Sequence, residues 1–173
     1  IMDGTYITKM RTGAAGGVAI KYLSRTDSKN AGFVGTGVQA RTQLEALLVT
    51  RPKIERAAAY DSNTASMKSF AEDAKVRYDL DAECTDSVEE AVRNADIVIT
   101  TTPSQSPIVN NEYIRRGTHI NAIGADAPGK QELDPEILKR AKIVIDNWEQ
   151  ASHGGEINVS LSKGYISQKD IYA

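Results

Sequence analysis

The chain has 173 residues, of which 40% are hydrophobic and 25% are charged, and its formal net charge is −2. This composition is typical of a globular domain with a real core, and no run comes near the roughly 18 consecutive apolar residues of a membrane span. Lysine and arginine are scattered among acidic residues, which argues against nucleic acid as a main partner, because phosphate binding needs a concentrated basic face.

The cysteine content and the two ends of the chain suggest the cellular compartment of the protein and its relation to a longer chain. The single cysteine, Cys84, cannot form an internal disulfide and is expected to be a small buried strand residue. No secretory leader is recognisable, so we expect a cytoplasmic protein. The chain begins at Ile1 and stops soon after a helix-cap pattern at Ser167 and Asp170, which predicts a domain excised from a longer two-domain protein. The alternative is a native terminus that frays.

The first predicted element is a helix over residues 8–25, capped by Thr8 and carrying an apolar stripe at helical spacing. Three glycines lie inside it, Gly13, Gly16 and Gly17. Each glycine costs a helix interior about 1 kcal/mol relative to alanine, so this group indicates a close approach to the helix backbone. The approaching partner is either a ligand or another helix.

A short apolar run over residues 31–34 breaks into Gly35-Thr36-Gly37-Val38-Gln39-Ala40, where a second helical pattern begins. A buried strand, a tight turn and a helix N-terminus in this order are the arrangement that receives a dinucleotide pyrophosphate. Gly35 permits the turn, Gly37 lets the backbone approach phosphate oxygens, and Ala40 keeps the helix near its strand. The helix dipole and free N–H groups attract the anion. The alternative is an ordinary glycine turn between a strand and a helix.

Two features that follow this loop favour the dinucleotide interpretation. One is a helical face made of apolar residues, Ala40, Leu44, Leu47 and Leu48. The other is a strand predicted over residues 54–60 that ends in Asp61. In the dinucleotide-binding fold a carboxylate at this place accepts hydrogen bonds from the adenosine ribose and repels a 2′-phosphate. Asp61 therefore predicts NAD as the cofactor in preference to NADP.

Farther along, the pattern predicts a helix from Asn63 or Thr64, a short strand over residues 82–84, and a helix opened by a cap pair of Asp86 with Glu89. The next run, residues 95–103, contains a continuous β-branched apolar stretch, which indicates a strand buried on both faces. It ends in Thr100, Thr101 and Thr102. These hydroxyls are expected at the carboxyl edge of the sheet, where open α/β sheets bind ligands; alternatively, threonine merely suits strands.

The last third of the chain continues the alternation. It predicts a helix from Asn110 or Asn111 to Gly117, a fifth strand over residues 118–124, a helix capped by Asp134 with Pro135 in its first turn, and a sixth strand over residues 143–146. Strands and helices that alternate with short connections predict an α/β fold with a doubly wound parallel sheet, a Rossmann-type three-layer αβα domain.

Asp126 is the carboxylate that we single out for chemistry. It follows the fifth strand in a loop rich in glycine and proline, at the sheet edge shared with Gly35 and Thr101. Near a reacting carbon it can act as general acid or base; the alternative is a turn carboxylate that bonds its own backbone. His119 is expected to be packed in its strand, and nothing near His153 has metal-ligand spacing, so no metal site is predicted.

The ordered motifs together resemble those of the ornithine cyclodeaminase and mu-crystallin family, and most of all its archaeal-type alanine dehydrogenase branch. The resemblance rests on Met2-Asp3-Gly4, Arg11-Thr12-Gly13-Ala14-Ala15, Gly35-Thr36-Gly37-Val38-Gln39-Ala40, Gly124-Ala125-Asp126-Ala127-Pro128-Gly129-Lys130 and His153-Gly154-Gly155-Glu156. These motifs cover essentially the whole chain, residues 1–173, as one NAD-binding domain.

The resemblance also implies roles for individual residues. Arg11 matches the arginine that holds the substrate carboxylate, and Asp126 matches the catalytic aspartate. The implied cofactor contacts are Thr12, Gly35, Gly37, Val38, Gln39, Asp61, Thr101, Thr102, Asn121, Ile123 and Lys130. Of these, Val38 and Gln39 correspond to positions on the pyrophosphate, and Asp61 to the position that holds the ribose.

Members of the family bind NAD and pass a hydride between it and the α-carbon of an amino acid or imine. The resemblance therefore implies the NAD-binding domain of an alanine dehydrogenase, which converts L-alanine, NAD and water to pyruvate, ammonia and NADH. The alternatives are an ornithine cyclodeaminase, which recycles NAD while it forms proline, and a non-catalytic nucleotide-binding sensor domain.

The family's catalytic lysine and its dimer-forming segment lie on an N-terminal part that has no match in this chain. We therefore expect that the fragment alone binds NAD without turning over substrate. The full-length protein is expected to be a homodimer that acts on a small amino acid, with no nucleic-acid or membrane partner.

Overall fold

The computed structural model describes residues 4–173, so Met2 and Asp3 of the first motif lie outside the described residues. The chain divides into two compact units. The first, which we call the sheet unit, runs to Thr101 and includes Arg115–Asn121; the second, the C-terminal unit, comprises Thr102–Ile114 and Ala122–Ala173. None of the described helices is long and apolar enough to cross a membrane.

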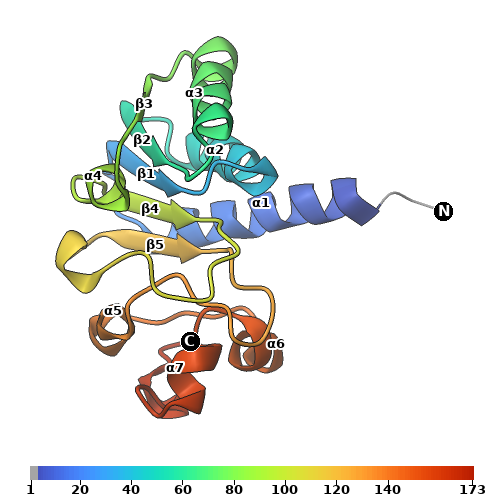
Figure 1. Cartoon of the computed structure of the whole chain (residues 1–173), viewed down its shortest axis with the longest axis vertical. Coiled ribbons are helices and arrows are strands. Elements are labelled where there is room, and N and C mark those ends of the chain that lie inside the picture. Colours follow the sequence, from blue (N-terminus) through green and yellow to red (C-terminus); the bar gives the residue numbers. More distant parts are fainter. Residues whose placement is uncertain (1–3) are drawn as a thin grey trace. The chain divides into compact units, whose positions relative to one another are not determined.

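A five-stranded sheet organises the first of these units. Its elements are α1 (Gly4–Leu23), β1 (Asn30–Val34), α2 (Val38–Thr50), β2 (Arg56–Tyr60), α3 (Thr64–Tyr78), β3 (Ala82–Cys84), α4 (Val88–Val92), β4 (Ile97–Thr100) and β5 (His119–Ala122). The strand order is β3-β2-β1-β4-β5, and the β1–β2, β1–β4 and β2–β3 ladders are parallel (Figure 1). This is a doubly wound order whose switch point lies between β1 and β4, so the predicted α/β fold is confirmed.

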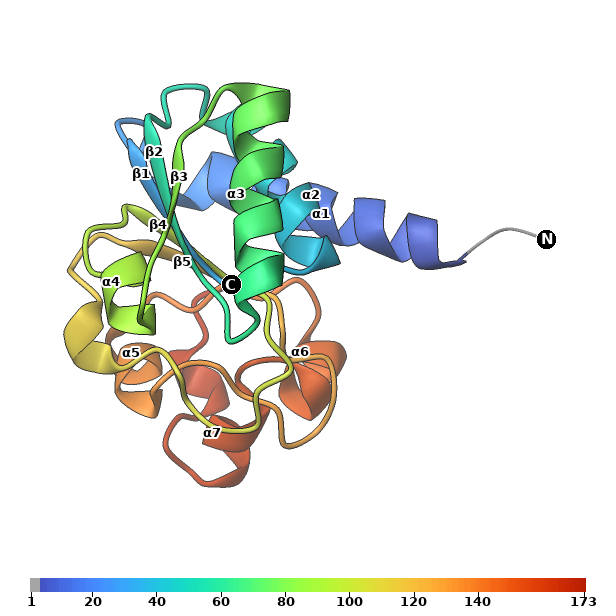
Figure 2. The same ribbon diagram turned by 45° about the horizontal axis from the view of Figure 1, so that its top comes forward.

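Helices α1, α2 and α3 cover one face of the sheet, and α4 lies on the opposite face (Figure 2). On the first face Phe33 of β1 pairs in register with Ala59 and Ile99, and its ring centroid lies 5.0 Å from that of Phe70 in α3. The small alanine leaves room for the two rings. On the other face, a Cβ added to Gly32 would lie 2.4 Å from the carbonyl oxygen of Ala91, so α4 packs directly on the β1 backbone.

The glycines of α1 are explained by another helix. A Cβ on Gly13 would lie 2.7 Å from the Cβ of Thr42, and one on Gly17 would lie 2.9 Å from that of Ala46, both in α2. The side-chain amide of Gln43, also in α2, donates to the carbonyl of Thr12 at 2.9 Å. The sequence left open whether a ligand or another helix approaches these glycines, and the structure shows another helix, α2.

Arg51, just after α2, closes the C-terminal end of α1. Its guanidinium is buried, and its donors reach the carbonyl oxygens of Ile20, Lys21, Ser24, Arg25 and Thr50 at 2.9–3.0 Å. The last carbonyls of a helix lack partners within the helix, and a cation there also complements the helix dipole. One side chain therefore satisfies two of the last four carbonyls of α1 and ties this helix end to the chain after α2.

We expect Arg51→Met to lower the free energy of unfolding by roughly 3 kcal/mol, because bonds from a charged donor are lost and several carbonyls stay buried without them. Urea denaturation followed by circular dichroism measures the change. Arg56→Met, at an exposed position of β2, is the matched control and should shift stability by no more than about 0.5 kcal/mol. Equal effects of the two substitutions would contradict the capping role.

The C-terminal unit is built from short elements: η1 (Asn111–Tyr113), α5 (Pro135–Arg140), α6 (Trp148–Gly154), α7 (Asn158–Ser162) and η2 (Gln168–Asp170). Asp134 caps α5 by accepting from the backbone N–H of Glu136, and Pro135 stands in the first turn, as predicted. The predicted cap pattern of Ser167 with Asp170 is also present, at η2.

Two helix predictions need correction in the sheet unit. The helix predicted over residues 8–25 begins at Gly4, so Thr8 lies inside it and caps nothing; it ends at Leu23. The cap of α4 is shifted by one residue from the predicted pair: Ser87 accepts from the N–H of Glu90. Cys84, expected to be buried, is exposed at the end of β3.

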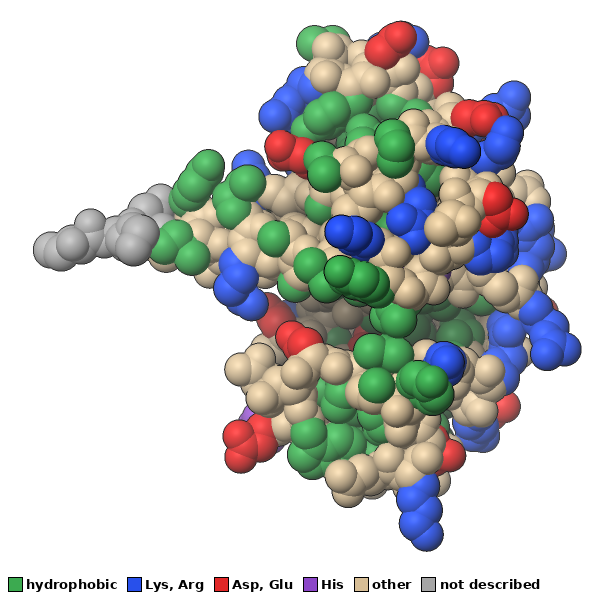
Figure 3. All heavy atoms as spheres, turned by 180° about the vertical axis from the view of Figure 1, so that it is seen from behind, with side chains coloured by type: hydrophobic (Ala, Val, Ile, Leu, Met, Phe, Trp, Pro, Cys, Tyr) green, Lys and Arg blue, Asp and Glu red, His purple; other side chains and the backbone are tan. Residues whose placement is uncertain are grey.

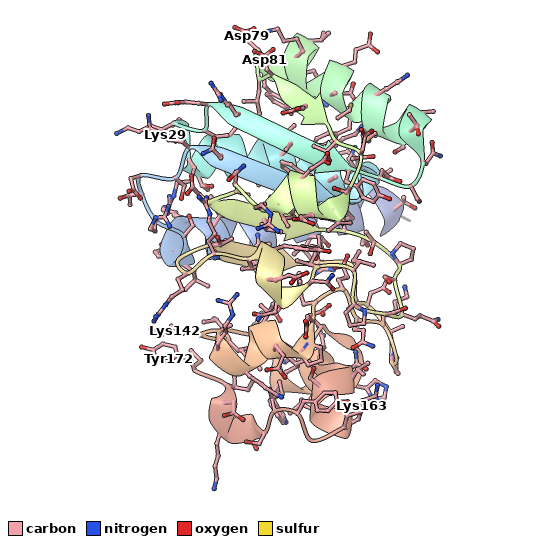
Figure 4. The ribbon with its side chains drawn as sticks, turned by 60° about the vertical axis from the view of Figure 1, so that its left-hand side comes forward. Lys29, Asp79, Asp81, Lys142, Lys163 and Tyr172 are labelled. Carbon is pink, nitrogen blue, oxygen red and sulfur yellow. The ribbon has the colours of Figure 1, made fainter. Side chains whose placement is uncertain are left out.

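Two predicted elements of the last third are reduced to fragments. The helix predicted from residue 110 or 111 to Gly117 is only the single turn η1, because the backbone is extended at Ile114; the Arg140 guanidinium donates to the carbonyls of Asn111 and Ile114. The sixth strand, predicted over residues 143–146, is one parallel bridge between Ile143 and Ile171. Beside it the ammonium of Lys142 lies 3.5 Å from the ring centroid of Tyr172 (Figure 4).

Candidate nucleotide-binding site and catalytic loop

The loop between β1 and α2 has the backbone of an anion site. Gly35 has φ +86°, which strains a residue with a side chain, and its N–H donates to the carbonyl of Tyr60 at 2.9 Å. Gly37, the N-cap of α2, has ordinary φ, and a Cβ added to it would meet no atom within 4 Å. The backbone conformation therefore explains Gly35, whereas neither conformation nor packing explains Gly37, whose missing side chain leaves open space at the helix start.

The N-terminus of α2 is available to an anionic ligand. Gly37 supplies no side-chain cap, and the first turn contains no acidic residue. The helix is 13 residues long, so its first N–H groups and its dipole both favour a negative charge. Val38 and Gln39 begin the helix, with Val38 exposed and Gln39 partly buried. These features fit a dinucleotide pyrophosphate.

Asp61 lies at the end of β2 and is bonded to the glycine loop. One carboxylate oxygen accepts from the N–H and hydroxyl of Thr36 at 2.7 and 2.8 Å, and the other accepts from the N–H of Asn63 at 2.8 Å. Burial by itself raises the pKa of Asp61, but these hydrogen bonds outweigh it and lower the pKa overall. A carboxylate offers about four acceptor positions, so one remains for a ribose hydroxyl.

Arg41 is a residue of this site that the sequence analysis missed. Its guanidinium donates to the carbonyls of Thr36 and Gly37 at 2.5 and 3.2 Å, and its Nε lies 2.7 Å from a carboxylate oxygen of Asp73. Because Arg41 occupies these carbonyl oxygens, the groups that the loop presents to an anion are its N–H donors. The available signal was the position of Arg41, because a cation in the first turn of a helix opposes the dipole and needs a specific partner.

The end of β4 adjoins the same loop. The hydroxyl of Thr101 donates to the carbonyl of Gly35 at 3.1 Å, and its N–H donates to that of Val34 at 2.9 Å. The sheet unit thus gathers a set of predicted cofactor residues around one loop: Gly35, Gly37, Val38, Gln39, Asp61 and Thr101.

Other predicted residues of this unit lie on α1 and β5. Arg11 is exposed and Thr12 is partly buried. Asn121 is buried, and both ends of its side chain are engaged: the Nδ2 donates to the carbonyl of Gly16 at 3.0 Å, and the Oδ1 lies 2.8 Å from the Nε2 of His119. Burial lowers the pKa of His119, although its bond to Asn121 opposes this, so the ring is packed and neutral at physiological pH.

In the C-terminal unit, Asp126 directly precedes a turn that ends at Lys130. The carbonyl of Ala127 accepts from the N–H of Lys130 at 3.2 Å, and Gly129 has φ +85°, as a type II turn with proline in second place requires. The ammonium of Lys130 lies 2.5 Å from a carboxylate oxygen of Asp126, whose side chain is 74% exposed. Ile123 precedes this turn and is partly buried.

A buried carboxylate, Glu132, connects this loop to Thr102. It is fully buried and accepts from the N–H and hydroxyl of Thr102 at 2.6 and 2.8 Å and from the N–H of Gly124 at 2.9 Å. The threonine predicted as a cofactor contact therefore donates its hydroxyl to Glu132. Sequence analysis missed Glu132 because a glutamate before a helix resembles an ordinary solvated residue.

Glu156, the last residue of the His153-Gly154-Gly155-Glu156 motif, is a second carboxylate beside this loop and is partly buried. Burial is the main cause that raises its pKa to about 8; the hydrogen bonds it accepts from Leu133 and Glu132 oppose this, and the charge of Glu132 adds to it. Among residues 4–173, no three His, Cys, Asp or Glu side chains are grouped as a metal site needs.

This raised pKa predicts that folding stability falls with pH. The folded protein keeps a proton on Glu156 up to about pH 8, whereas the unfolded chain loses it near its ordinary value of 4.5, so stability declines across that window. We expect Glu156→Gln to remove a decline on the order of 3 kcal/mol. Urea denaturation from pH 5 to pH 8 measures it, and identical slopes for both proteins would contradict it.

The sequence profile of the ornithine cyclodeaminase/mu-crystallin family matches residues 1–172. Among curated proteins, the alanine dehydrogenase of Archaeoglobus fulgidus is 53% identical over 175 residues, which cover 100% of this chain and 52% of that protein.

Solved structures agree with these sequence matches. An archaeal alanine dehydrogenase, solved as a dimer with bound NAD, superposes with a TM-score of 0.94 at 54% identity, over 98% of this chain and 52% of that one. The Δ1-pyrroline-2-carboxylate reductase of Thermococcus litoralis, solved with NADH and L-proline, has a TM-score of 0.93 at 43% identity, over 97% and 52%. The chain spans about half the length of the proteins it matches.

Proposed function

This chain belongs to the ornithine cyclodeaminase/mu-crystallin family, and from that premise we propose that it is the NAD-binding part of an amino-acid dehydrogenase. The proposal rests on one observation: the N-terminus of α2 has no side-chain cap, and the space beside Gly37, where a side chain would project, is open. Asp61 is bonded to the same loop. Relatives solved with NAD or NADH support this choice of cofactor.

NAD supplies the hydride acceptor when it is bound. In this proposal the first N–H groups of α2 bind its pyrophosphate, and the remaining acceptor position of Asp61 takes a ribose hydroxyl. The negative charge of Asp61 repels a 2′-phosphate, so NAD is preferred to NADP. Thr101 supports the glycine loop from the side of β4.

The substrate half of the proposal rests on Arg11 and Asp126. The exposed guanidinium of Arg11 offers the planar fork that suits a carboxylate. Asp126 acts as general base, taking a proton from the substrate amine or from the water that adds to the resulting imine. The electron pair of the α-carbon–hydrogen bond leaves as hydride, and hydrolysis of the imine releases a keto acid and ammonia. With L-alanine as substrate, the keto acid is pyruvate.

A cyclodeaminase is the second candidate, supported by the ornithine cyclodeaminases that the family is named for. Parallel assays of the full-length protein with NAD and either L-alanine or L-ornithine distinguish a dehydrogenase from a cyclodeaminase. Accumulation of NADH with alanine supports the dehydrogenase, whereas proline formed from ornithine without net NADH supports the cyclodeaminase. Binding of NAD without turnover of either would indicate a sensor domain.

The 173-residue chain by itself should bind NAD without turnover, because it spans about half of its relatives. Isothermal titration with NAD tests the first part, and an alanine assay of the same chain tests the second. Absence of NAD binding would overturn the proposed function at its base.

We also propose that the full-length protein is a homodimer in which the apolar side of α1 is covered. Figure 3 shows hydrophobic side chains along this helix, and Tyr6, Val18 and Tyr22 are 58–73% exposed. Met10, Val18, Ala46 and Val49 line a shallow hollow of about 290 Å³ between α1 and α2. Light scattering on the full-length protein measures its mass, and a monomer would contradict the proposal.

A further inference from the structure

One motif is left without a role by the proposed function: His153-Gly154-Gly155-Glu156, at the end of α6. In the C-terminal unit it adjoins residues 124–133, which we call the Asp126 loop. A Cβ added to Gly154 would lie 3.4 Å from the backbone of Ala127 in this loop. The motif and the residues after it therefore pack against the segment that carries Asp126 and Lys130.

Glu132 joins both ends of the Asp126 loop. Its carboxylate accepts from the N–H of Gly124, where the loop begins, and from Thr102, which follows β4. The contact leaves no room for a side chain at position 124, since a Cβ there would lie 2.1 Å from the carbonyl oxygen of Thr102 and 2.7 Å from the Cδ of Glu132. The start of the loop is thus held by one buried carboxyl side chain.

Glu156 holds the far end of the loop. Its carboxylate oxygens accept from the N–H groups of Glu132, at 2.9 and 3.0 Å, and of Leu133, at 2.7 Å. The backbone that carries the first carboxylate is therefore fixed by the second. Removing this side chain leaves the N–H groups of Glu132 and Leu133 without their acceptor, so the substitution acts on the loop directly.

Asn158, in α7, holds the turn between these two ends. Its Oδ1 accepts from the N–H of Gly129 at 2.9 Å, and its Nδ2 donates to the carbonyl of Lys130 at 2.8 Å. The residue is only 7% exposed. It grips the backbone at the position from which the Lys130 side chain projects.

We propose that Glu132, Glu156 and Asn158 are positioning residues, which fix the backbone of the Asp126 loop and thereby the places of Asp126 and Lys130. Asp126 is 74% exposed, so packing around its own side chain does not locate it. Burying polar groups is costly unless they are hydrogen-bonded, and each of these three makes hydrogen bonds to this loop. The inference rests on the proposed role of Asp126 in the reaction and on the cofactor contact expected of Lys130.

Hydrogen exchange tests the structural half without relying on any activity. In Glu156→Ala we expect the amides of Glu132 and Leu133 to exchange about tenfold faster or more, while those of Phe33 and Ile99 in the sheet keep their rates. Glu156→Gln, whose amide oxygen still accepts from both N–H groups, should stay within threefold of wild type, an order-of-magnitude bound. Unchanged exchange at 132 and 133 in the alanine variant overturns the inference.

Steady-state kinetics of the full-length protein test whether Glu156 positions Asp126. We expect kcat to fall about 10- to 100-fold in Glu156→Ala, with recovery in Glu156→Gln, because a displaced proton-transfer group slows chemistry. The affinity for NAD should fall less than kcat, since the pyrophosphate site lies on α2 and only the contact expected of Lys130 is displaced. Glu149→Ala, which removes an exposed carboxylate of α6, is the matched control and should leave kcat unchanged.

The outcomes separate this inference from the proposed function. If the wild-type protein turns over no amino acid, the proposed function fails, and hydrogen exchange still decides whether the loop is held as described. If the wild type is active and kcat is unchanged in Glu156→Ala, the positioning role is overturned while the function stands. Should Glu156→Ala not fold, Asn158→Ala replaces it: faster exchange at Gly129 with lower kcat supports the inference, and unchanged values overturn it.

Discussion

Asp126→Asn is expected to lower kcat by about 10²- to 10⁴-fold, the range found when a positioned general base is removed. Asparagine keeps the shape of the side chain but cannot accept the proton. The ion pair with Lys130 that is lost is exposed on the Asp126 side and contributes little to stability, so the protein should remain folded. Steady-state kinetics with saturating NAD and the amino acid identified by the parallel assays measure the change.

Asp146→Asn is the matched control for this substitution. Asp146 is an exposed carboxylate of the same unit, and its loss should leave kcat within about twofold of wild type, as for most surface changes. Titration with NAD should give similar affinities for all three proteins. An Asp126→Asn enzyme that keeps more than about a tenth of wild-type kcat would contradict a proton-transfer role.

Asp61→Asn is expected to reduce the preference for NAD over NADP by about a hundredfold. A carboxylate and a 2′-phosphate a few ångströms apart repel by about 3 kcal/mol at the effective dielectric of a protein surface, and asparagine removes that repulsion. Its amide oxygen still accepts hydrogen bonds, so the glycine loop should remain in place. Calorimetric titration of wild type and variant with both cofactors gives the ratio of affinities.

Asp79→Asn is the control for the charge itself. Asp79 has a 90% exposed side chain, and its φ of 51° is a conformation that asparagine also adopts readily. This variant should retain the wild-type preference. If Asp61→Asn binds the two cofactors in the same ratio as wild type, Asp61 does not select NAD.

Local chemistry made much of the sheet unit predictable. Alternating strand and helix patterns determine a doubly wound sheet, and a glycine with φ of +86° at position 35 is needed wherever a strand turns tightly into a helix. The apolar face of α2 follows from 3.6-residue periodicity alone, and Ala40, Leu44 and Leu47 are indeed buried. The position of Asp61 was also predictable, because it directly follows the strand that lies beside the glycine turn.

Residues far apart in the sequence decided what the patterns could not. Arg140 donates to the carbonyls of Asn111 and Ile114 beside the single turn η1, and Ile143 pairs with Ile171 instead of extending the sheet. Both contacts involve chain segments about 25 to 30 residues away, and local propensity contains no information about them.

The sequence by itself determined the fold class, the glycine loop with Asp61 and the family, because each follows from residues adjacent in the chain or in motif order. Only the tertiary structure showed that α2 is what the α1 glycines accommodate, that Arg41 occupies the loop carbonyls, and that Glu132 and Glu156 hold the Asp126 loop. The physical reason is that the sequence shows the type of a charged side chain but not its hydrogen-bond partner. That partner can be water or a backbone group distant in the chain, and it is determined only when the chain folds.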